Sequence, residues 1–310
     1  MILFHDDIQK ADARERALRE LRSFLDRYEP KLARFLVNTW RSQGKAITYK
    51  ELREAIMHCM MGGGLQEVRL FQQLFDEWQQ DYARFVVDVV APFWEEAVKA
   101  ATNRIRNRYP AWSFDETRQG IAKWVEDAGA IFVTNSTSVQ LAGIREAVRL
   151  AAVVQNLNVD TLAQVVRPMV GLYRGQVVAN MNYFTSLIEG GMSEKRAVNL
   201  ATRYAARQHR YRAMNIARTE MAFAYNRGAD MYVQEAIKQG FMGETVKIFC
   251  CSADERVCSV CGSLEGKVIT MEQDFDFHTR LTYPGIRRMP PVHPSCRCAV
   301  IYEEIQGPTF

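Results

Sequence analysis

The sequence predicts a mainly α-helical protein, with elongated helical N-terminal and middle regions and a small C-terminal α+β module. Up to about Gly240, apolar residues recur at intervals of three and four, the period of an amphipathic helix. After Gly240, β-branched and aromatic runs between turn residues indicate short strands. Six of the seven cysteines lie within the last 61 residues, which marks this segment as a separate unit.

The N-terminal region, residues 1–112, contains a helix start at Thr48. Thr48 and Glu51 have the spacing of a capping box, in which each side chain accepts a hydrogen bond from an unpaired backbone N–H. The glycines at 62–64 end the helix that follows. The most apolar stretch, from Phe85 to Trp94, is about half as long as a bilayer requires, so we expect no membrane span.

The middle region, residues 113–240, opens on a second predicted capping box, Ser113 with Glu116. Long amphipathic stretches follow at Ile144–Val154 and Leu162–Leu187. The helix behind the second box has one apolar face, formed by Ile121, Trp124, Val125, Ala128 and Phe132.

The C-terminal module, residues 241–310, contains three predicted strands, in the runs "ETVKIFCC", "KVIT" and "CAVIYEE". Cys250 and Cys251 lie in the first of these strands, where we expect ordinary packing. Cys59 stands alone in a helical context and is expected to be a small core residue.

The composition is that of an ordinary folded protein, because 48% of the 310 residues are hydrophobic and 25% are charged. The N-terminus becomes charged within six residues, so we expect no secretory signal. An odd number of cysteines without a signal favours metal binding over a disulfide framework.

An arginine-rich segment, Arg203–Arg227, holds six arginines against one acidic residue, Glu220. A solvated helical face is the ordinary interpretation of such a run. The alternative is contact with an acidic protein surface or with the backbone of double-stranded DNA, nonspecifically, because no base-reading motif is visible. The candidate contact residues are Arg203, Arg207, Arg210 and Arg212. His209 in the same segment, and His278 further on, are expected to be surface histidines.

The C-terminal pattern of cysteine and histidine is that of a zinc site. Cys258 and Cys261 form a CxxC turn. After 31 intervening residues, His293 and Cys296 form an HxxC turn, and Cys298 follows two positions later. Two such turns can supply the four ligands of a tetrahedral zinc site. These four are the favoured ligands, and Cys298 is the substitute if His293 instead hydrogen-bonds its own loop.

Three alternatives to zinc remain at this point: disulfides formed outside the cell, a metal-free core of thiols, and a redox pair. The redox pair needs a surrounding βαβ pattern, which the sequence lacks.

The site is expected to be structural, with no catalytic residues. Four protein ligands close a zinc site, whereas a catalytic zinc keeps one position open for water. Both the HExxH motif of zinc proteases and the His-x-Glu of deaminases are missing. Glu255 and Glu265 flank the CxxC turn but are expected to be exposed. Residues 240–310 contain seven basic and nine acidic residues, so we do not expect this module to bind DNA. We expect the metal instead to stabilise the fold of this small module.

Three linked motifs resemble the phage Mu F-like family of minor head proteins, also called phage head morphogenesis proteins. They are "IARTEMAFAYNRG", "DERVCSVCGSLEGKV" and "PPVHPSCRCAVIYEE". The resemblance covers about residues 120–305. Phe249, where the family carries Trp, and the Cys250–Cys251 doublet depart from the family pattern.

The resemblance implies a structural protein, present in few copies inside the head, that acts at the portal vertex in procapsid assembly and in DNA packaging or delivery. It implies as partners the portal protein and the inner capsid or scaffold, and as location the virion, with the host cytoplasm during assembly. By resemblance, Arg218, Thr219 and Glu220 pack the helix around the module, and the five Cys and His positions match those of the family. The alternatives are a metal-dependent nuclease or other hydrolase, and a nonspecific DNA-binding protein.

Overall fold

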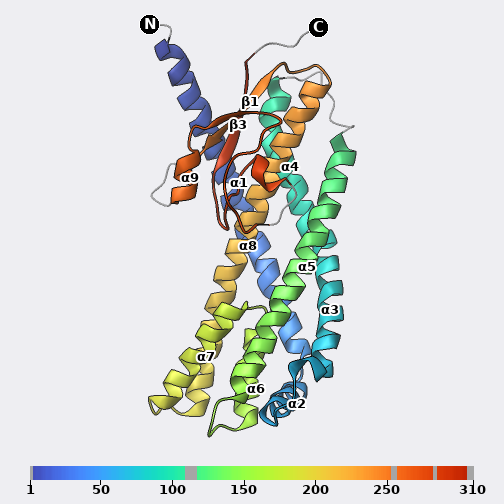
Figure 1. The fold of residues 1–310 in the computed structure, drawn as a ribbon, viewed down its shortest axis with the longest axis vertical. Helices are drawn as coiled ribbons and strands as arrows, with labels where there is room; N and C mark the ends of the chain where they lie inside the picture. The colour runs from blue at the N-terminus through green and yellow to red at the C-terminus, as the bar shows by residue number, and fades with distance from the viewer. Residues whose placement is uncertain (1–2, 109–116, 253–256, 282–284, 306–310) are drawn as a thin grey trace. The chain divides into compact units, whose positions relative to one another are not determined.

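The computed structural model describes residues 3–108, 117–252, 257–281 and 285–305. The protein is mainly helical, with one small antiparallel sheet near the C-terminus (Figure 1), which confirms the predicted fold class. The predicted capping box at Ser113 and Glu116, and also Glu255, lie outside the described residues.

The chain forms two compact units, each assembled from segments that are distant in sequence. Unit 1 comprises residues 1–31, 89–131 and 215–310, and unit 2 comprises residues 32–88 and 132–214. The limits of the units fall inside helices rather than in loops. The division of the sequence into three consecutive regions stays a prediction.

Unit 2 is helical among its described residues. It contains the second part of α1 (Leu3–Ala46), the start of the π-helical segment η2 (Val86–Val90), most of α5 (Thr117–Ala152) and the first part of α8 (Glu194–Lys238). Its other elements are α2 (Tyr49–Met60), η1 (Leu65–Glu67), α3 (Arg69–Phe85), α6 (Val159–Val166), η3 (Arg167–Met169) and α7 (Arg174–Glu189).

The capping box at Thr48 is confirmed. The Thr48 side chain accepts from Glu51 N at 3.2 Å, and Glu51 Oε2 accepts from Thr48 N at 2.8 Å. The helix ends at Met60, and Gly62 takes a left-handed conformation (φ 85°) that favours glycine.

The predicted stretch Leu162–Leu187 is not one helix but two, α6 and α7, separated by η3. Pro168 has no N–H to continue α6. Gly171 then turns the chain at φ 95°, and a Cβ at this position would lie 2.5 Å from the Trp40 ring. A turn pressed against a buried tryptophan therefore separates the two helices.

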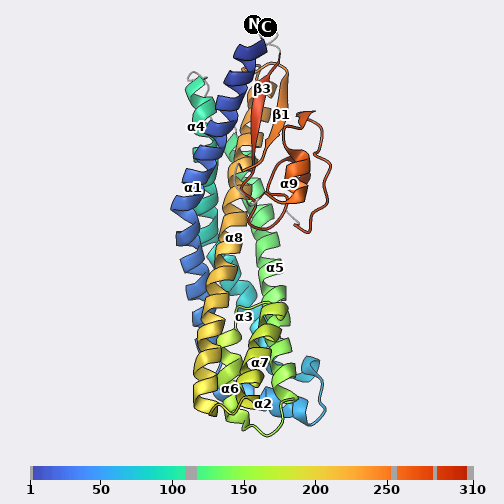
Figure 2. The same cartoon turned by 90° about the vertical axis from the view of Figure 1, so that its left-hand side faces the viewer.

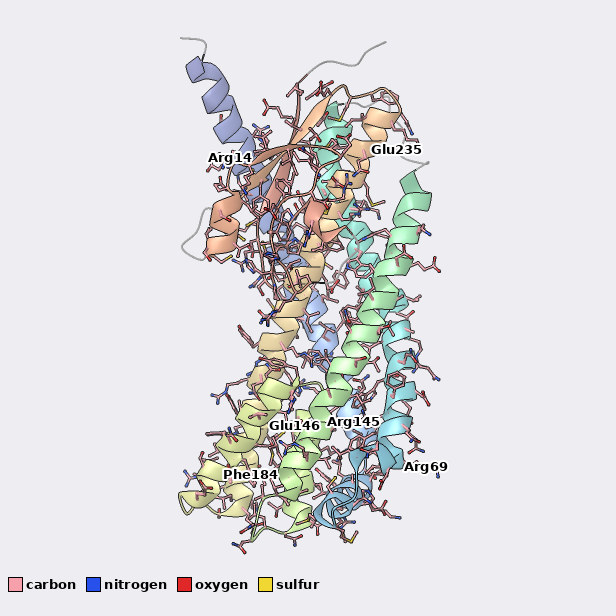
Figure 3. The ribbon with its side chains drawn as sticks, in the orientation of Figure 1. Arg14, Arg69, Arg145, Glu146, Phe184 and Glu235 are labelled. Atoms are coloured by element: carbon pink, nitrogen blue, oxygen red, sulfur yellow. The ribbon has the colours of Figure 1, made fainter. Side chains whose placement is uncertain are left out.

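Unit 2 has a core of buried aromatic side chains with a polar chain running through it. Trp40 Nε1 donates to the Tyr82 hydroxyl at 2.8 Å, and that hydroxyl donates to Gln140. Gln140 Nε2 donates in turn to Gln43 Oε1 at 2.9 Å. Phe184 of α7, labelled in Figure 3, is fully buried in the same unit. The buried polar groups of these four side chains are thus hydrogen-bonded to one another, as a stable core requires.

Unit 1 contains the first part of α1, α4 (Ala91–Arg108), the start of α5 and the second part of α8. Its helical core is aromatic: the ring centroids of Trp94 and Trp124 lie 5.3 Å apart, and Trp124 lies 5.9 Å from Phe223. Trp124 and Ala128 are buried, as the predicted apolar face of that helix requires.

The three predicted strands are confirmed as one antiparallel sheet in the order β2-β1-β3. They are β1 (Thr245–Cys250), β2 (Val268–Thr270) and β3 (Ala299–Glu304), with a short helix α9 (Ser259–Leu264) and a 3-10 turn η4 (Ile286–Arg288) between them. Figure 2 shows β1 and β3 beside the last part of α8. Phe249, at the position of the family's Trp, is fully buried, with its ring 5.3 Å from Phe275.

In the part of the chain that the structure describes, no helix combines the length and the apolar character needed to cross a bilayer.

Candidate metal centre

Two loops of unit 1 bring the five predicted ligands together. Cys258 caps the start of α9 and Cys261 lies in its first turn. His293 and Cys296 belong to the loop before β3, and Cys298 directly precedes that strand. Their ligand atoms form two overlapping groups, Cys258 with Cys261 and His293, and Cys261 with Cys296 and Cys298. Within each group the atoms lie within 4.8 Å of one another.

Cys261 lies at the centre of the cluster. Its Sγ is 3.2 Å from His293 Nε2 and 3.8 Å from Cys296 Sγ. Cys261, Cys296 and Cys298 are at most 3% exposed, whereas Cys258 and His293 are partly exposed. The cluster is therefore buried on its thiol side and reaches the surface at Cys258 and His293.

The CxxC turn is shaped by its own backbone. Cys258 is extended (φ −77°, ψ 163°), and its Sγ accepts from Cys261 N at 3.3 Å. The short α9 thus directs both sulfurs to one side of the turn.

The HxxC turn depends on Ser295, which takes a left-handed conformation (φ 63°) although it is not a glycine. Cys296 N donates to His293 O at 3.2 Å and closes the turn. The reversal at Ser295 lets His293 and Cys296 face the same sulfur of Cys261.

Helix α8 holds this reversal in place. Ser295 N donates to Thr219 Oγ1 at 2.9 Å, and Ser295 Oγ donates to Asn215 Oδ1 at 2.8 Å. The Thr219 hydroxyl donates to Asn215 O at 2.7 Å, which leaves its lone pairs free to accept from Ser295. A conformation that costs free energy in a non-glycine residue is thereby compensated by two hydrogen bonds.

Asn226, two turns further along α8, binds the chain on the other side of the cluster. Its Nδ2 donates to Cys298 O at 3.2 Å, and its Oδ1 accepts from Val300 N at 3.3 Å. Asn226 is 2% exposed, so these hydrogen bonds are shielded from water. Cys298 is fixed at the point where the loop becomes β3.

A buried charged cluster around Asp230 anchors the loop before His293. Asp230 is fully buried and lies 3.2 Å from Arg227 Nη1 and 3.5 Å from Arg288 Nε, and it accepts from Gln234 Nε2 at 2.6 Å. Burial raises the pKa of Asp230, and the two guanidinium groups lower it. Because Arg288 belongs to η4, this contact ties η4 to α8.

His293 presents the nitrogen that a metal needs. Its Nδ1 lies 2.8 Å from the carbonyl oxygen of Pro294, which can only accept, so Nδ1 carries the proton. The lone pair is then on Nε2, the atom that faces Cys261. Hydrogen bonding of the second ring nitrogen to a backbone carbonyl is the usual arrangement of metal-binding histidines.

The three buried thiols influence one another's ionisation. The hydrogen bond with Cys261 lowers the pKa of Cys296, and the same contact raises the pKa of Cys261. Hydrogen bonds with Cys261 and Cys296 raise the pKa of Cys298. Adjacent thiolates repel each other, and a bound cation is what allows several of them to ionise together.

A cavity of about 230 Å³ adjoins the cluster, lined by its five ligand residues and by Arg218, among others. Arg218 is held by a bidentate ion pair, because its Nε and Nη2 donate to the two carboxylate oxygens of Glu29 at 2.9 Å each. Glu29 is 2% exposed, so the pair is largely desolvated.

The residues present fit a zinc ion. Thiolate and imidazole are the ligands that zinc prefers, the donor atoms form two groups of three that share Cys261, and the lone pair of His293 Nε2 faces Cys261. The cluster could therefore hold a metal, and four of its five donors would complete a tetrahedron.

The cysteines outside the cluster mostly follow expectation. Cys250 is fully buried and Cys251 is 7% exposed, and Cys251 Sγ donates to Cys261 O at 2.8 Å. Cys59 differs, because it is partly exposed rather than a core residue. It lies near the exposed end of α2, where it is followed by the exposed Met60. His278 is exposed, as predicted.

Two predictions for α8 are wrong. His209 is not a surface histidine, because it is 7% exposed and hydrogen-bonded to Val170 O at 2.8 Å. Arg212 is 9% exposed, donates to Gly171 O and lies over the Trp40 ring at 5.0 Å, so it cannot face a nucleic acid. Arg203, Arg207 and Arg210 are exposed.

Sequence reasoning missed the polar stripe that supports the cluster. Asn215 and Asn226 were not singled out, and Thr219 was expected only to pack. A signal existed, because positions 215, 219 and 226 are separated by four and seven residues and thus share one helical face.

The family of proteins described as "Phage Mu protein F like protein" matches residues 150–301. This match confirms, over that segment, the family resemblance that the motifs predicted. The matched segment contains all five cluster residues and the α8 stripe that supports them. Comparisons with curated proteins and with solved structures give no match.

Proposed function

We propose that this protein is a structural minor head protein of a tailed phage, acting at the portal vertex in head assembly and in DNA packaging or delivery. The family match over residues 150–301 carries this proposal. The portal protein and the inner capsid or scaffold are its proposed partners, and the interior of the head is its proposed location.

The proposed cofactor is one structural zinc ion, held by Cys258, Cys261, His293 and Cys296, with Cys298 as the possible replacement for one of them. A bound zinc supplies folding free energy to loops that have few strands of their own. The protein itself is proposed to hold both ligand-bearing segments in position. Helix α9 holds the CxxC turn, and Asn215, Thr219 and Asn226 hold the loop before β3.

The three exposed arginines of the predicted set, Arg203, Arg207 and Arg210, are proposed to contact packaged DNA nonspecifically. Replacing all three with glutamine should weaken binding of duplex DNA and reduce its salt dependence by about three counterions. Binding at low salt that is unchanged by the replacement would refute this contact.

Cobalt substitution tests the closed structural site. The d–d absorption of the cobalt form should be that of a tetrahedral thiolate site, and small anions such as azide should not alter it. A spectrum that shifts with azide would instead indicate an exchangeable ligand, as in the alternative of a metal-dependent hydrolase.

Quantitative mass spectrometry of purified particles tests the location. We expect this chain at a few copies per particle, up to the copy number of the portal subunit. Its presence in infected cells and its absence from particles would contradict a role in the mature head.

A further inference from the structure

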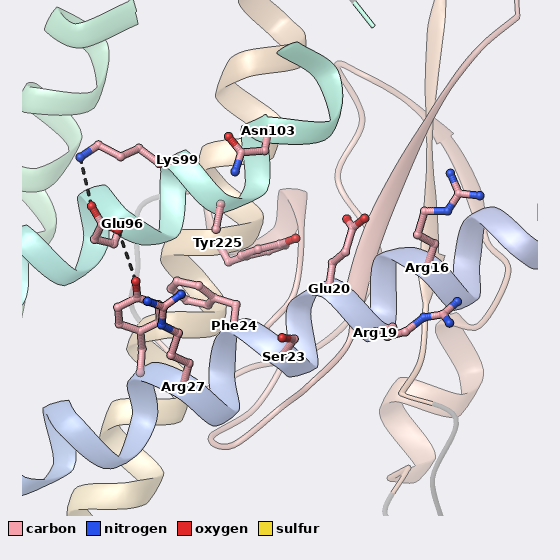
Figure 4. A pocket seen from close by; sticks show the side chains of 12 residues that line it. Arg16, Arg19, Glu20, Ser23, Phe24, Arg27, Glu96, Lys99, Asn103 and Tyr225 are labelled. Atoms are coloured by element: carbon pink, nitrogen blue, oxygen red, sulfur yellow. Dashed lines mark hydrogen bonds and ion pairs between the residues drawn. The ribbon is translucent and has the colours of Figure 1, made fainter. Parts of the chain in front are cut away.

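Unit 1 carries a groove that the metal centre does not use (Figure 4). It has a volume of about 850 Å³ and lies between α1 and α4, with Tyr225 of α8 in its wall. All of its lining residues belong to unit 1. A volume of this size exceeds what one side chain can fill and falls in the range of ligand sites.

The floor of the groove is aromatic and firmly packed. The ring centroid of Phe24 lies 4.7 Å from that of Tyr28 and 5.5 Å from that of Tyr225. Phe24 and Tyr225 are only 6% and 7% exposed, so their positions are fixed by packing. Tyr28 is partly exposed, so its ring is the part of this floor that apolar side chains of an occupant can contact.

The rim of the groove is cationic. Arg16, Arg19 and Arg27 of α1 are exposed, and none of them has a carboxylate partner among the side chains that the structure describes. Arg16 and Arg27 are eleven positions apart, so the cations extend over roughly 16 Å, three turns of helix. Lys99 on α4 is already paired with Glu96 at 3.1 Å, as Figure 4 shows.

The groove also contains acidic groups, which limit what can bind. Glu96 is occupied, because it pairs with Lys99 and accepts from the Tyr28 hydroxyl at 3.3 Å. Glu20 lies between Arg19 and Phe24 along α1, and it lines the groove. Three arginines against Glu20 leave the lining of the groove with a net positive charge.

We infer that this groove binds an acidic, amphipathic helical segment of a partner protein. Carboxylates of the segment would pair with Arg16, Arg19 and Arg27, while its apolar side chains would contact the ring of Tyr28, as in helix-in-groove recognition. A peptide can offer a basic side chain to Glu20. Nucleic acid cannot, because its phosphates carry only negative charge and would be repelled there. The inference is independent of the metal and of the proposed role in the head.

The test is a binding measurement on the full chain by fluorescence anisotropy. The probe is an 18-residue labelled helical peptide with glutamates on one face and leucines on the other. Its counterpart carries glutamine in place of each glutamate. We expect the acidic peptide to bind at least tenfold more tightly than its counterpart, with an affinity that falls as salt is added.

Two variants locate the binding. Replacing Arg16, Arg19 and Arg27 with glutamine should weaken binding at least tenfold, and Ser23→Trp should weaken it by filling the groove without a change in charge. The matched control replaces three exposed arginines of unit 1 that lie outside the groove, and it should bind within twofold of the unmodified chain. Its positions are Arg22, Arg280 and Arg287. Circular dichroism verifies that each variant is folded.

Three results would overturn the inference. Equal losses in the groove variant and the control variant would mean that only net charge matters. Equal binding of the two peptides would remove the role of carboxylates. A 20-base-pair duplex that binds the unmodified chain but not the groove variant, without any binding of the acidic peptide, would assign the groove to nucleic acid.

Discussion

At the scale of single residues, the metal centre depends on a serine in a conformation that glycine usually supplies. Ser295 has φ 63°, and the two hydrogen bonds to Asn215 and Thr219 stabilise it. The cysteines and His293 provide the donor atoms, but Ser295 and its partners determine where two of those atoms lie. Residues outside the ligand set are therefore expected to contribute to the affinity of the cluster for a metal.

Thr219→Val keeps the side-chain shape and removes the acceptor for Ser295 N. We expect zinc affinity to fall by about tenfold to 100-fold, the range found for groups that orient metal ligands. Ser295→Gly tolerates the left-handed conformation without support, so Thr219→Val should cost less in that background. Competition with a chromophoric chelator measures both affinities. If the unmodified chain binds zinc and Thr219→Val binds it equally well, α8 does not position the site.

His209 makes the stability of unit 2 dependent on pH. Its pKa is lowered to about 4, mainly by burial and also by Arg212 and Arg41, against a hydrogen bond to Val170 O that raises it. The unfolded chain takes up this proton near pH 6.5, whereas the folded chain takes it up only near pH 4. The stability is thus fully present above pH 6.5 and falls as the pH decreases toward 4.

The His209 contribution to that loss should reach about 3 kcal/mol, since each unit of pKa corresponds to 1.36 kcal/mol. Urea unfolding at pH 7, 6, 5 and 4 measures it, and His209→Gln serves as the comparison because the other groups titrate in both proteins. Parallel curves for the two proteins would show that His209 does not titrate in this way.

At the scale of elements, α8 contributes residues to both units, and different side chains of this helix are buried in each unit. In its first part, a buried row at intervals of four residues contains Ala197, Ala201, Ala205, His209 and Ala213. In its second part, Gly228 allows close approach to α4, because a Cβ there would lie 2.8 Å from Val98 Cα. Small residues thus permit helix contacts that larger ones would prevent.

Gly228→Ala should destabilise the protein, although the same change in an open helix stabilises it by about 1 kcal/mol. The clash with the α4 backbone should reverse the sign and give a loss of about 1–3 kcal/mol. Gly44→Ala in α1 is the matched control, because its Cβ would meet other atoms only at 3.5 Å or beyond. Denaturant unfolding compares the two. A Gly228→Ala protein as stable as the Gly44→Ala protein would contradict the close contact.

At the scale of the whole molecule, stability is distributed unevenly. Unit 2 is held by a continuous helical core, whereas the C-terminal part of unit 1 has three short strands, long loops and the Cys/His cluster. Buried side chains such as Phe275, Phe277 and Met289 pack these loops, and metal binding between them is expected to add to their folding free energy.

Removal of the metal by a chelator should therefore loosen residues 257–281 and 285–305 while α2, α6 and α7 stay protected. Hydrogen exchange with mass spectrometry, before and after chelation and after zinc is restored, measures this difference. Exchange in the loops that is unaffected by chelation would show that the cluster does not need a metal to fold.

The fold class, the three strands, the cap at Thr48 and the set of five candidate ligands could all be predicted from the amino-acid sequence. These features depend on local rules: periodicity, cap spacing and the chemistry of cysteine and histidine. The alanines at positions 197, 201, 205 and 213 also indicate that position 209, at the same interval of four, lies on a buried face. The charge of the arginine-rich segment pointed instead to an exposed face.

Which residues support the site, and which arginines are buried, depends on packing between distant segments of the chain. Thr219 and Ser295 are 76 positions apart, and Arg212 is buried because Gly171 and Trp40 meet it from other parts of the chain. Local sequence patterns carry no information about such partners, since hydrogen bonds and burial between distant segments depend on how the helices pack. The sequence therefore named the ligand atoms, and the packing of α8 against the loops placed them.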